Sequence, residues 1–209
     1  MFELELVNGG KRYNAEWIFK GLDLTIKSGD SVVFLGGNGS GKSTTLRTLF
    51  GYAPLSSGEL DYRKDGKVVK QPEAYKYFSY CAPYLDLYEE LTLNELANFH
   101  FRLKPILPEL SDEKPADLFG LGRAADKQIK YFSSGMKQRV RLGLGIMSDS
   151  DVIFLDEPTV NLDREAIEWY GEIVEKYRGD RIILVASNRQ EHEYFFCRQK
   201  IEIENYKPA

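Results

Sequence analysis

The chain has 209 residues, of which 43% are hydrophobic, enough for one substantial core with at most a small lobe attached. Its net charge of −4 gives no general attraction to polyanions, so we expect no nucleic-acid partner. Its two cysteines are too few for a disulfide framework, and no apolar run approaches the ~20 residues that span a bilayer. We therefore expect a cytoplasmic protein.

Apolar segments predict strands along much of the chain. The first of them places acids among its apolar residues, which is typical of a strand and not of an export signal. A further segment, 59–69, contains an Asp65-Gly66 turn signal and is expected to pair antiparallel at a sheet edge. The first segment is residues 2–7, and the remaining predicted strands cover residues 22–26, 31–35, 76–82, 152–155, 182–185 and 199–204.

The segment GGNGSGKST at 36–44 lies between the apolar strand 31–35 and a predicted helix, which is the context of a phosphate-binding loop. Lys42 is expected to reach the β- and γ-phosphates of a nucleotide, and the Ser43 hydroxyl to bind Mg²⁺. A glycine-rich turn without a ligand is the alternative, and the flanking strand and helix disfavour it. The residues expected to contact the nucleotide here are Gly36, Gly37, Asn38, Gly39, Ser40, Gly41, Lys42, Ser43 and Thr44.

From about residue 88 to residue 148 the apolar spacing changes from two to nearly four, which indicates an inserted helical lobe. After the buried strand 152–155 follows a helix that Asp163 caps and Gly179 ends. The predicted fold class is α/β. It consists of a P-loop NTPase core sheet, an N-terminal antiparallel β-subdomain and the inserted helical subdomain.

Two acids, Asp156 and Glu157, directly follow the buried strand 152–155. A carboxylate at a strand end beside a phosphate-binding loop is placed to hold Mg²⁺, and Asp156 fits that role. We expect Glu157 to polarise a water for attack on the γ-phosphate. Adjacent acids at a strand end are otherwise often solvated turn residues, but the apolar strand and the loop upstream favour the catalytic interpretation.

A third motif, FSSGMKQR at 132–139, predicts a helix N-terminus with free N–H groups that suits an anion. Taken alone, it is better explained by a simple capped helix. Because it lies between the loop 36–44 and the acids at 156–157, we instead interpret it as part of a nucleotide site.

Together these segments resemble the nucleotide-binding subunit of ABC transporters over almost the whole chain. The discriminating element is the signature-like motif, because other P-loop ATPases and kinases have Walker motifs without it. The resemblance implies ATP with Mg²⁺, phosphate contacts from Ser133 and Gly135, a D-loop ending at Asp163, and stacking of adenine on Tyr13. It also implies that residues 1–209 form a single ATP-binding domain.

The resemblance further implies partners. A second ATP-binding subunit, most simply a second copy, would pair head to tail so that the signature of one subunit caps the ATP of the other. Separate membrane-spanning permease subunits would dock near residues 83–91 and hold the chain on the cytoplasmic face of the membrane. The apolar side chains of this segment would otherwise only cover the helical lobe.

Two positions depart from the family pattern. Pro83 stands where the family usually has a glutamine that touches Mg²⁺, and Asn188 stands where it has a switch histidine. An Ala-Pro at the first position is similar to the ATPases of haem exporters of cytochrome c biogenesis. Asn188 can donate a hydrogen bond but cannot carry a proton, so we expect slow hydrolysis that depends on Glu157, Lys42 and Asn188. His192, a turn later, is an alternative to Asn188, although a surface role explains it more simply.

Three functions follow from this resemblance. The leading hypothesis is the ATP-hydrolysing subunit that powers an ABC-type transporter, since the compact length resembles the exporter-type subunits more than the importers. The alternative is a nucleotide-gated switch subunit that hydrolyses ATP weakly or not at all. A soluble ABC protein acting on DNA or ribosomes is disfavoured, because those members usually carry a second cassette or a long coiled-coil insertion.

Overall fold

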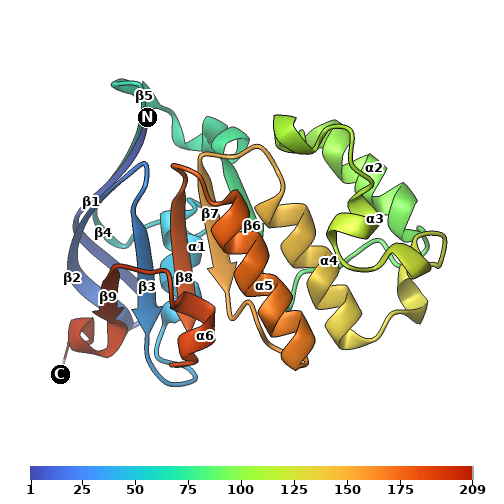
Figure 1. Ribbon diagram of the computed structural model, residues 1–209. Helices are drawn as coiled ribbons and strands as arrows, with labels where there is room; N and C mark the ends of the chain where they lie inside the picture. The colour runs from blue at the N-terminus through green and yellow to red at the C-terminus, as the bar shows by residue number, and fades with distance from the viewer. Residues whose placement is uncertain (209) are drawn as a thin grey trace.

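The computed structural model describes residues 1–208 and contains two sheets and a helical lobe (Figure 1). The N-terminal sheet is antiparallel, with strand order β2-β1-β4-β5. Its hairpin between β4 and β5 turns at Asp65 and Gly66, which both have positive φ as a tight two-residue hairpin turn requires. The strands are β1 (Phe2–Tyr13), β2 (Glu16–Lys27), β4 (Ser57–Lys64) and β5 (Lys67–Val69).

The central sheet is parallel and has five strands in the order β6-β7-β8-β3-β9. The inner strands β3, β7 and β8 are buried at every position, as strands covered on both faces must be. Their carboxyl ends point to one edge, where α1 (Lys42–Leu49) follows β3. The strand bounds are β3 (Ser31–Leu35), β6 (Phe78–Cys81), β7 (Val152–Asp156), β8 (Ile182–Ser187) and β9 (Gln199–Glu202).

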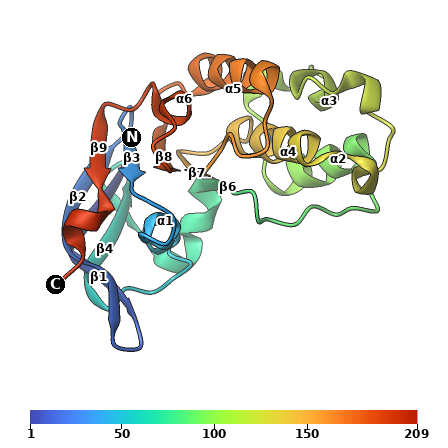
Figure 2. The same ribbon diagram turned by 90° about the horizontal axis from the view of Figure 1, so that it is seen from below.

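Two hydrophobic cores lie on opposite faces of the central sheet. In β3 the side chains alternate between them, because successive residues of a strand point to opposite faces. Val33 and Leu35 belong to the core shared with the helical lobe, whereas Val32 and Phe34 belong to the core beneath the antiparallel sheet. The central sheet thus joins the lobe at one end of the molecule to the antiparallel sheet at the other (Figure 2).

The helical lobe is inserted between β6 and β7. Its first helix begins with a capping box in which Thr92 and Glu95 each bind the other's backbone N–H. Short 3₁₀ helices connect the longer elements: Gln71–Tyr77, Pro108–Leu110, Gly122–Ala124, Ile129–Tyr131 and, near the C-terminus, Ile203–Tyr206. The α-helices after β6 are α2 (Leu93–Leu103), α3 (Pro115–Leu118), α4 (Ser134–Ile146), α5 (Arg164–Tyr177) and α6 (Glu191–Tyr194).

The predicted fold class is confirmed, but the bounds of several strands were wrong, including 22–26, which is part of the longer β2 (Glu16–Lys27). The strand expected over 76–82 covers only Phe78–Cys81, because the preceding Gln71–Tyr77 segment forms a 3₁₀ helix with proline at its start. The last strand ends at Glu202 and continues as a 3₁₀ helix. The first hairpin is longer than expected, since β1 continues past residue 7 to Tyr13 through irregular pairing with β2. Within residues 1–208, no helix has the length and apolar character needed to cross a membrane.

A pair of helical glycines tests how tightly the lobe is packed. A Cβ at Gly143 in α4 would lie 2.2 Å from the ring of Phe119, which is fully buried, whereas a Cβ at Gly171 in α5 would make an ordinary 3.7 Å contact. We expect Gly143→Ala to lower the free energy of unfolding by about 1–3 kcal/mol through overpacking. The matched Gly171→Ala should raise it by up to about 1 kcal/mol through helix propensity. Urea unfolding measures both, and equal effects would contradict this description of the lobe.

Candidate nucleotide-binding site

The loop between β3 and α1 is wound tightly by glycines with positive φ. Gly39 has φ 74° and Gly41 has φ 111°, and Gly41 is the N-cap of α1. A glycine at this cap leaves the first N–H groups of the helix free to face a ligand. They face a cavity of about 300 Å³ lined by Ile18, Asn38, Gly39, Gly41, Lys42, Ser43, Thr44 and Glu157. The loop therefore has the form of a phosphate cradle.

The Lys42 side chain is only 4% exposed and lies across this loop. Its ammonium donates a hydrogen bond of 3.0 Å to the Gly37 carbonyl and lies 3.9 Å from Glu157 Oε1. Among the described residues, the buried hydroxyl of Ser40 has no hydrogen-bond partner. Ser40 does not line the cavity, because its hydroxyl packs beneath the loop against Gly36. The Lys42 ammonium beside the free helix N–H groups fits the terminal phosphates of a nucleotide.

Ser43 and Asp156 come together although 113 residues separate them in sequence. The Ser43 hydroxyl donates to Asp156 Oδ1 at 2.9 Å, and the Asp156 side chain is buried at the end of β7. Oxygen ligands of this kind, one carboxylate and one hydroxyl beside phosphates, are those that Mg²⁺ prefers. The donor set thus fits Mg²⁺, with Ser43 and Asp156 as the residues that would hold it.

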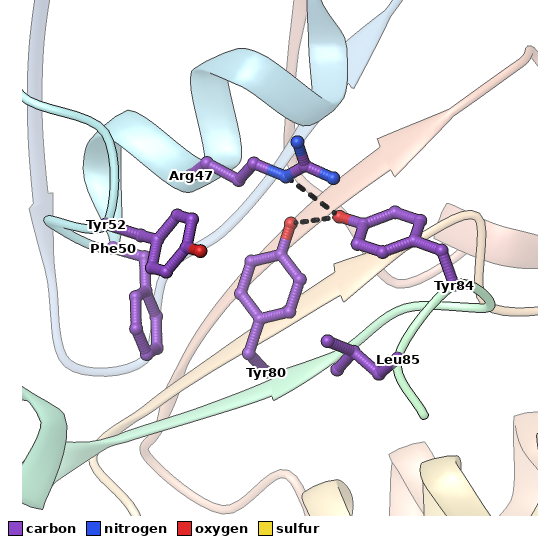
Figure 3. Close-up of a pocket in the computed structure, with 6 residues that line it drawn as sticks. All are labelled: Arg47, Phe50, Tyr52, Tyr80, Tyr84 and Leu85. Carbon is purple, nitrogen blue, oxygen red and sulfur yellow. Dashed lines mark hydrogen bonds between the residues drawn. The ribbon is translucent and has the colours of Figure 1, made fainter. Parts of the chain in front are cut away.

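Two tyrosines also contact Asp156, and sequence reasoning missed both. Tyr84 donates to Asp156 Oδ2 at 2.7 Å, and Tyr80 donates to the same oxygen at 3.3 Å. Burial raises the pKa of both tyrosines, and the neighbouring Asp156 carboxylate adds to this effect, so both hydroxyls remain protonated donors. Figure 3 shows the two hydroxyls pointing toward each other and toward Arg47 of α1.

Glu157 follows Asp156 in a left-handed conformation, with φ 44°, that few non-glycine residues adopt. Its backbone N–H still donates to the Ala186 carbonyl at 2.9 Å, so the turn comes directly after the sheet ends. The turn directs the carboxylate away from that of Asp156 and toward Lys42. Glu157 lines both the loop cavity and a neighbouring cavity of about 260 Å³.

This neighbouring cavity is lined also by Asn188 and His192. The Asn188 side chain donates to Asn38 Oδ1 of the phosphate-binding loop at 3.1 Å, so the residue after β8 contacts this loop. His192 Nε2 lies 2.9 Å from the Thr159 hydroxyl, which faces the same cavity. Both candidates for the switch position are thus close to Glu157.

A buried carboxylate, Glu193, fixes the segments around this cavity. It accepts hydrogen bonds from the Ser187 hydroxyl and from the backbone N–H and hydroxyl of Thr159. Burial raises the pKa of Glu193, and these donors partly oppose that shift. The end of β8 and the segment after Glu157 are therefore held by one side chain.

The signature-like residues lie on the helical lobe and not in the loop cavity. Ser133 is the N-cap of α4, where its hydroxyl accepts from the Met136 N–H at 3.2 Å. A Cβ on Gly135 would lie 2.9 Å from the Asn161 carbonyl, so only glycine allows this close approach. Asp163 caps α5 by accepting from the Ala166 N–H. Within this chain, Ser133 and Asp163 act as helix caps.

Tyr13 lies at the end of β1 with about half of its surface exposed, and the Lys11 ammonium is 4.9 Å from its ring centroid. The hairpin residue that lines the loop cavity is Ile18 of β2. Its side chain covers Gly41, where a Cβ would lie 2.4 Å from Ile18 Cγ2. Nothing in the sequence around Ile18 indicated this contact.

Comparison with known proteins identifies the family of this chain. A family model described as "ABC transporter" matches residues 19–160. The chain belongs to the ABC transporter family. Among curated proteins, the chain is 36% identical over 173 residues to the maltose/maltodextrin import ATP-binding protein MalK of Aliivibrio fischeri, covering 78% of this chain and 45% of that protein.

Two further similarities extend over more of this ABC family chain. It is 31% identical over 209 residues to the uncharacterized ABC transporter ATP-binding protein YhcH of Bacillus subtilis, covering 93% of this chain and 64% of that protein. A solved ATP binding subunit of an ABC transporter superposes with TM-score 0.80 at 25% identity, covering 96% of this chain and 86% of that one. The chain thus spans between 45% and 64% of the length of these curated relatives. It is an ABC transporter ATP-binding protein by family.

Two glycines with positive φ test the phosphate cradle. Gly41 has φ 111° and Gly29, in the turn before β3, has φ 91°. Alanine at either position is strained by about 1–2 kcal/mol. We expect Gly41→Ala to weaken ATP binding about tenfold or more, because the loop and Ile18 must move apart, and Gly29→Ala to change it by less than about twofold. Titration with a fluorescent ATP analogue measures both, and equal losses would contradict the assignment of the cradle.

Proposed function

We propose that this chain is the ATP-hydrolysing subunit of an ABC-type membrane transporter and that it works as a head-to-tail dimer. The observation that supports this most strongly is the contact between Ser43 and Asp156 beside Lys42. It brings a hydroxyl, a buried carboxylate and an ammonium together at the free N-terminus of α1. A protein that binds Mg²⁺ and a nucleoside triphosphate needs these groups.

In the proposed reaction the chain's own residues position ATP and a water molecule. The α1 N–H groups and Lys42 bind the β- and γ-phosphates, and Ser43 and Asp156 hold Mg²⁺, which when bound neutralises phosphate charge. Glu157 accepts a proton from the attacking water. The new bond joins the water oxygen to the γ-phosphorus, and the bond to the β–γ bridging oxygen breaks. The products are ADP and phosphate.

The dimer in this proposal completes each site with the partner's lobe. Ser133, Gly135 and Asp163 lie on the helical lobe or at its junction with the core, where they are available to a second copy. Tyr13, at the other end of the chain's own site, would stack on adenine. The exposure of Ser133 and Asp163 supports the proposal, because a partner could reach both residues.

The expected permease surface lies on one side of the lobe. The segment 83–91 exposes the rings of Tyr84 and Tyr88, and Tyr88 packs edge-on against Phe99. Tyr88 and Phe99 line an open cavity of about 680 Å³. An exposed apolar surface of this kind favours a protein partner. We propose that permease subunits bind here and place the chain on the cytoplasmic face of a membrane.

The substitution Glu157→Gln tests hydrolysis against a purely nucleotide-gated function. Removing the proton acceptor should lower phosphate release by about 10²–10³-fold while leaving ATP binding intact. We expect ATP with Mg²⁺ to dimerise Glu157→Gln more completely than the parent, because hydrolysis no longer opens the pair. Phosphate release and sedimentation with ATP measure the two effects. Equal dimerisation with no phosphate release from either form would identify a non-hydrolysing switch subunit instead.

The control for this experiment is Asn188→His, which changes the residue beside Glu157 without removing the proton acceptor. A histidine can carry a positive charge next to the γ-phosphate, whereas asparagine only donates a hydrogen bond. We expect the isolated parent to be slow and Asn188→His to be faster by about tenfold or more. A parent that already turns over as fast as Asn188→His would contradict the role given to this position.

A further inference from the structure

The loop after β6 begins with two side chains that offer no hydrogen-bonding group. Pro83 follows Ala82 there, and proline offers no side-chain oxygen or nitrogen. The next residue is Tyr84, whose hydroxyl reaches the metal-site carboxylate across 72 residues of sequence. The polar group that this loop brings to the site is therefore the hydroxyl of Tyr84.

The two oxygens of Asp156 are held by different parts of the chain. Oδ1 accepts from Ser43 at 2.9 Å, and Oδ2 accepts from Tyr84 at 2.7 Å. Tyr80 contributes a longer bond of 3.3 Å to Oδ2 and lies 2.9 Å from the Tyr84 hydroxyl. A carboxylate with a donor on each oxygen cannot rotate without breaking at least one short hydrogen bond. The Tyr84 bond thus fixes the plane of this carboxylate.

The Tyr84 ring is itself held by the helix that carries the phosphate-binding loop. The Arg47 guanidinium of α1 lies 4.5 Å from the Tyr84 ring centroid, and its Nε donates to the Tyr84 hydroxyl at 3.3 Å. The ring lines a cavity of about 370 Å³ together with Arg47, Phe50, Tyr52, Tyr80 and Leu85 (Figure 3). Tyr84 therefore connects α1, the end of β7 and an open cavity.

We propose that Tyr84 is a positioning residue of the metal site, which holds Asp156 in the orientation that binds Mg²⁺. The inference rests on the proposed binding of Mg²⁺ and ATP and adds a residue to it. Tyr84 acts through Asp156 and does not replace it as a ligand. Loss of such an outer hydrogen bond to a metal-binding carboxylate typically weakens metal binding by about 10–100-fold.

The conservative variant Tyr84→Phe removes only the hydroxyl and keeps the ring against Arg47 and the cavity. Binding of a fluorescent, non-hydrolysable ATP analogue is measured at saturating Mg²⁺ and again in EDTA. Asp156 contributes mainly through the metal, so we expect Tyr84→Phe to weaken binding about tenfold or more with Mg²⁺ and less than about twofold in EDTA. A general structural defect would weaken both equally.

Two tyrosine variants serve as controls. Tyr52→Phe changes a hydroxyl in the same cavity, but no hydrogen bond joins Tyr52 to Asp156 in the described chain, so its Mg²⁺-dependent binding should equal that of the parent. Tyr80→Phe removes the longer bond and should have an effect between those of the other two. The thermal midpoint of each variant is measured alongside to compare their folding.

The outcomes separate this inference from the proposed function. A parent chain that binds no nucleotide contradicts the proposed function and, with it, the role of Tyr84. A parent that binds normally, with Tyr84→Phe unchanged in Mg²⁺, contradicts the inference alone. Tighter Mg²⁺-dependent binding in Tyr84→Phe also overturns it, because the hydroxyl would then compete with the metal for Asp156.

Discussion

The buried carboxylate of Asp156 is the group on which the site depends. A charged side chain at the end of a fully covered strand is stable only if donors surround it. Here the short hydrogen bonds come from Ser43 at the start of α1 and Tyr84 after β6, and Tyr80 adds a longer one. One carboxylate thereby joins the phosphate-binding loop, the central strand β7 and the segment that leads into the helical lobe. Its hydrogen bonds link these three parts to one another.

The parallel order of the central sheet explains why these residues meet. The phosphate-binding loop follows β3, Glu157 follows β7, Asn188 follows β8 and Tyr84 follows β6, each at a carboxyl end. In parallel α/β sheets these ends lie at the same edge, which is where ligands bind. From this same edge the chain continues after β6 into the helical lobe. The residues that face the phosphates and those that line the cavity beside Tyr84 are therefore neighbours.

Sequence reasoning pointed to groups whose chemistry follows from one local pattern, and their roles at the site stay predictions. The glycine-rich loop, the acids after an apolar strand and the signature-like helix start each have a recognisable spacing. Tyr84 and Ile18 could not be predicted in this way, because an aromatic or aliphatic residue near a strand end normally belongs to the core. Tyr84 contacts Asp156, and Ile18 lies over Gly41. Both contacts depend on how the strands are arranged in space, which the local sequence does not show. The strand expected over 76–82 was too long for a related reason, since its apolar pattern continues into a 3₁₀ helix.

The most direct test of this account is a crystal structure of the chain with ATP and Mn²⁺ in place of Mg²⁺, solved with anomalous scattering from the metal. The account predicts a metal peak beside the β- and γ-phosphates, about 2.1 Å from the Ser43 hydroxyl oxygen, which is the bond length typical of small divalent ions with oxygen ligands. Asp156 should contact this metal directly or through one water, with Tyr84 still donating to its other oxygen. A bound nucleotide whose metal lies away from both Ser43 and Asp156 would contradict it.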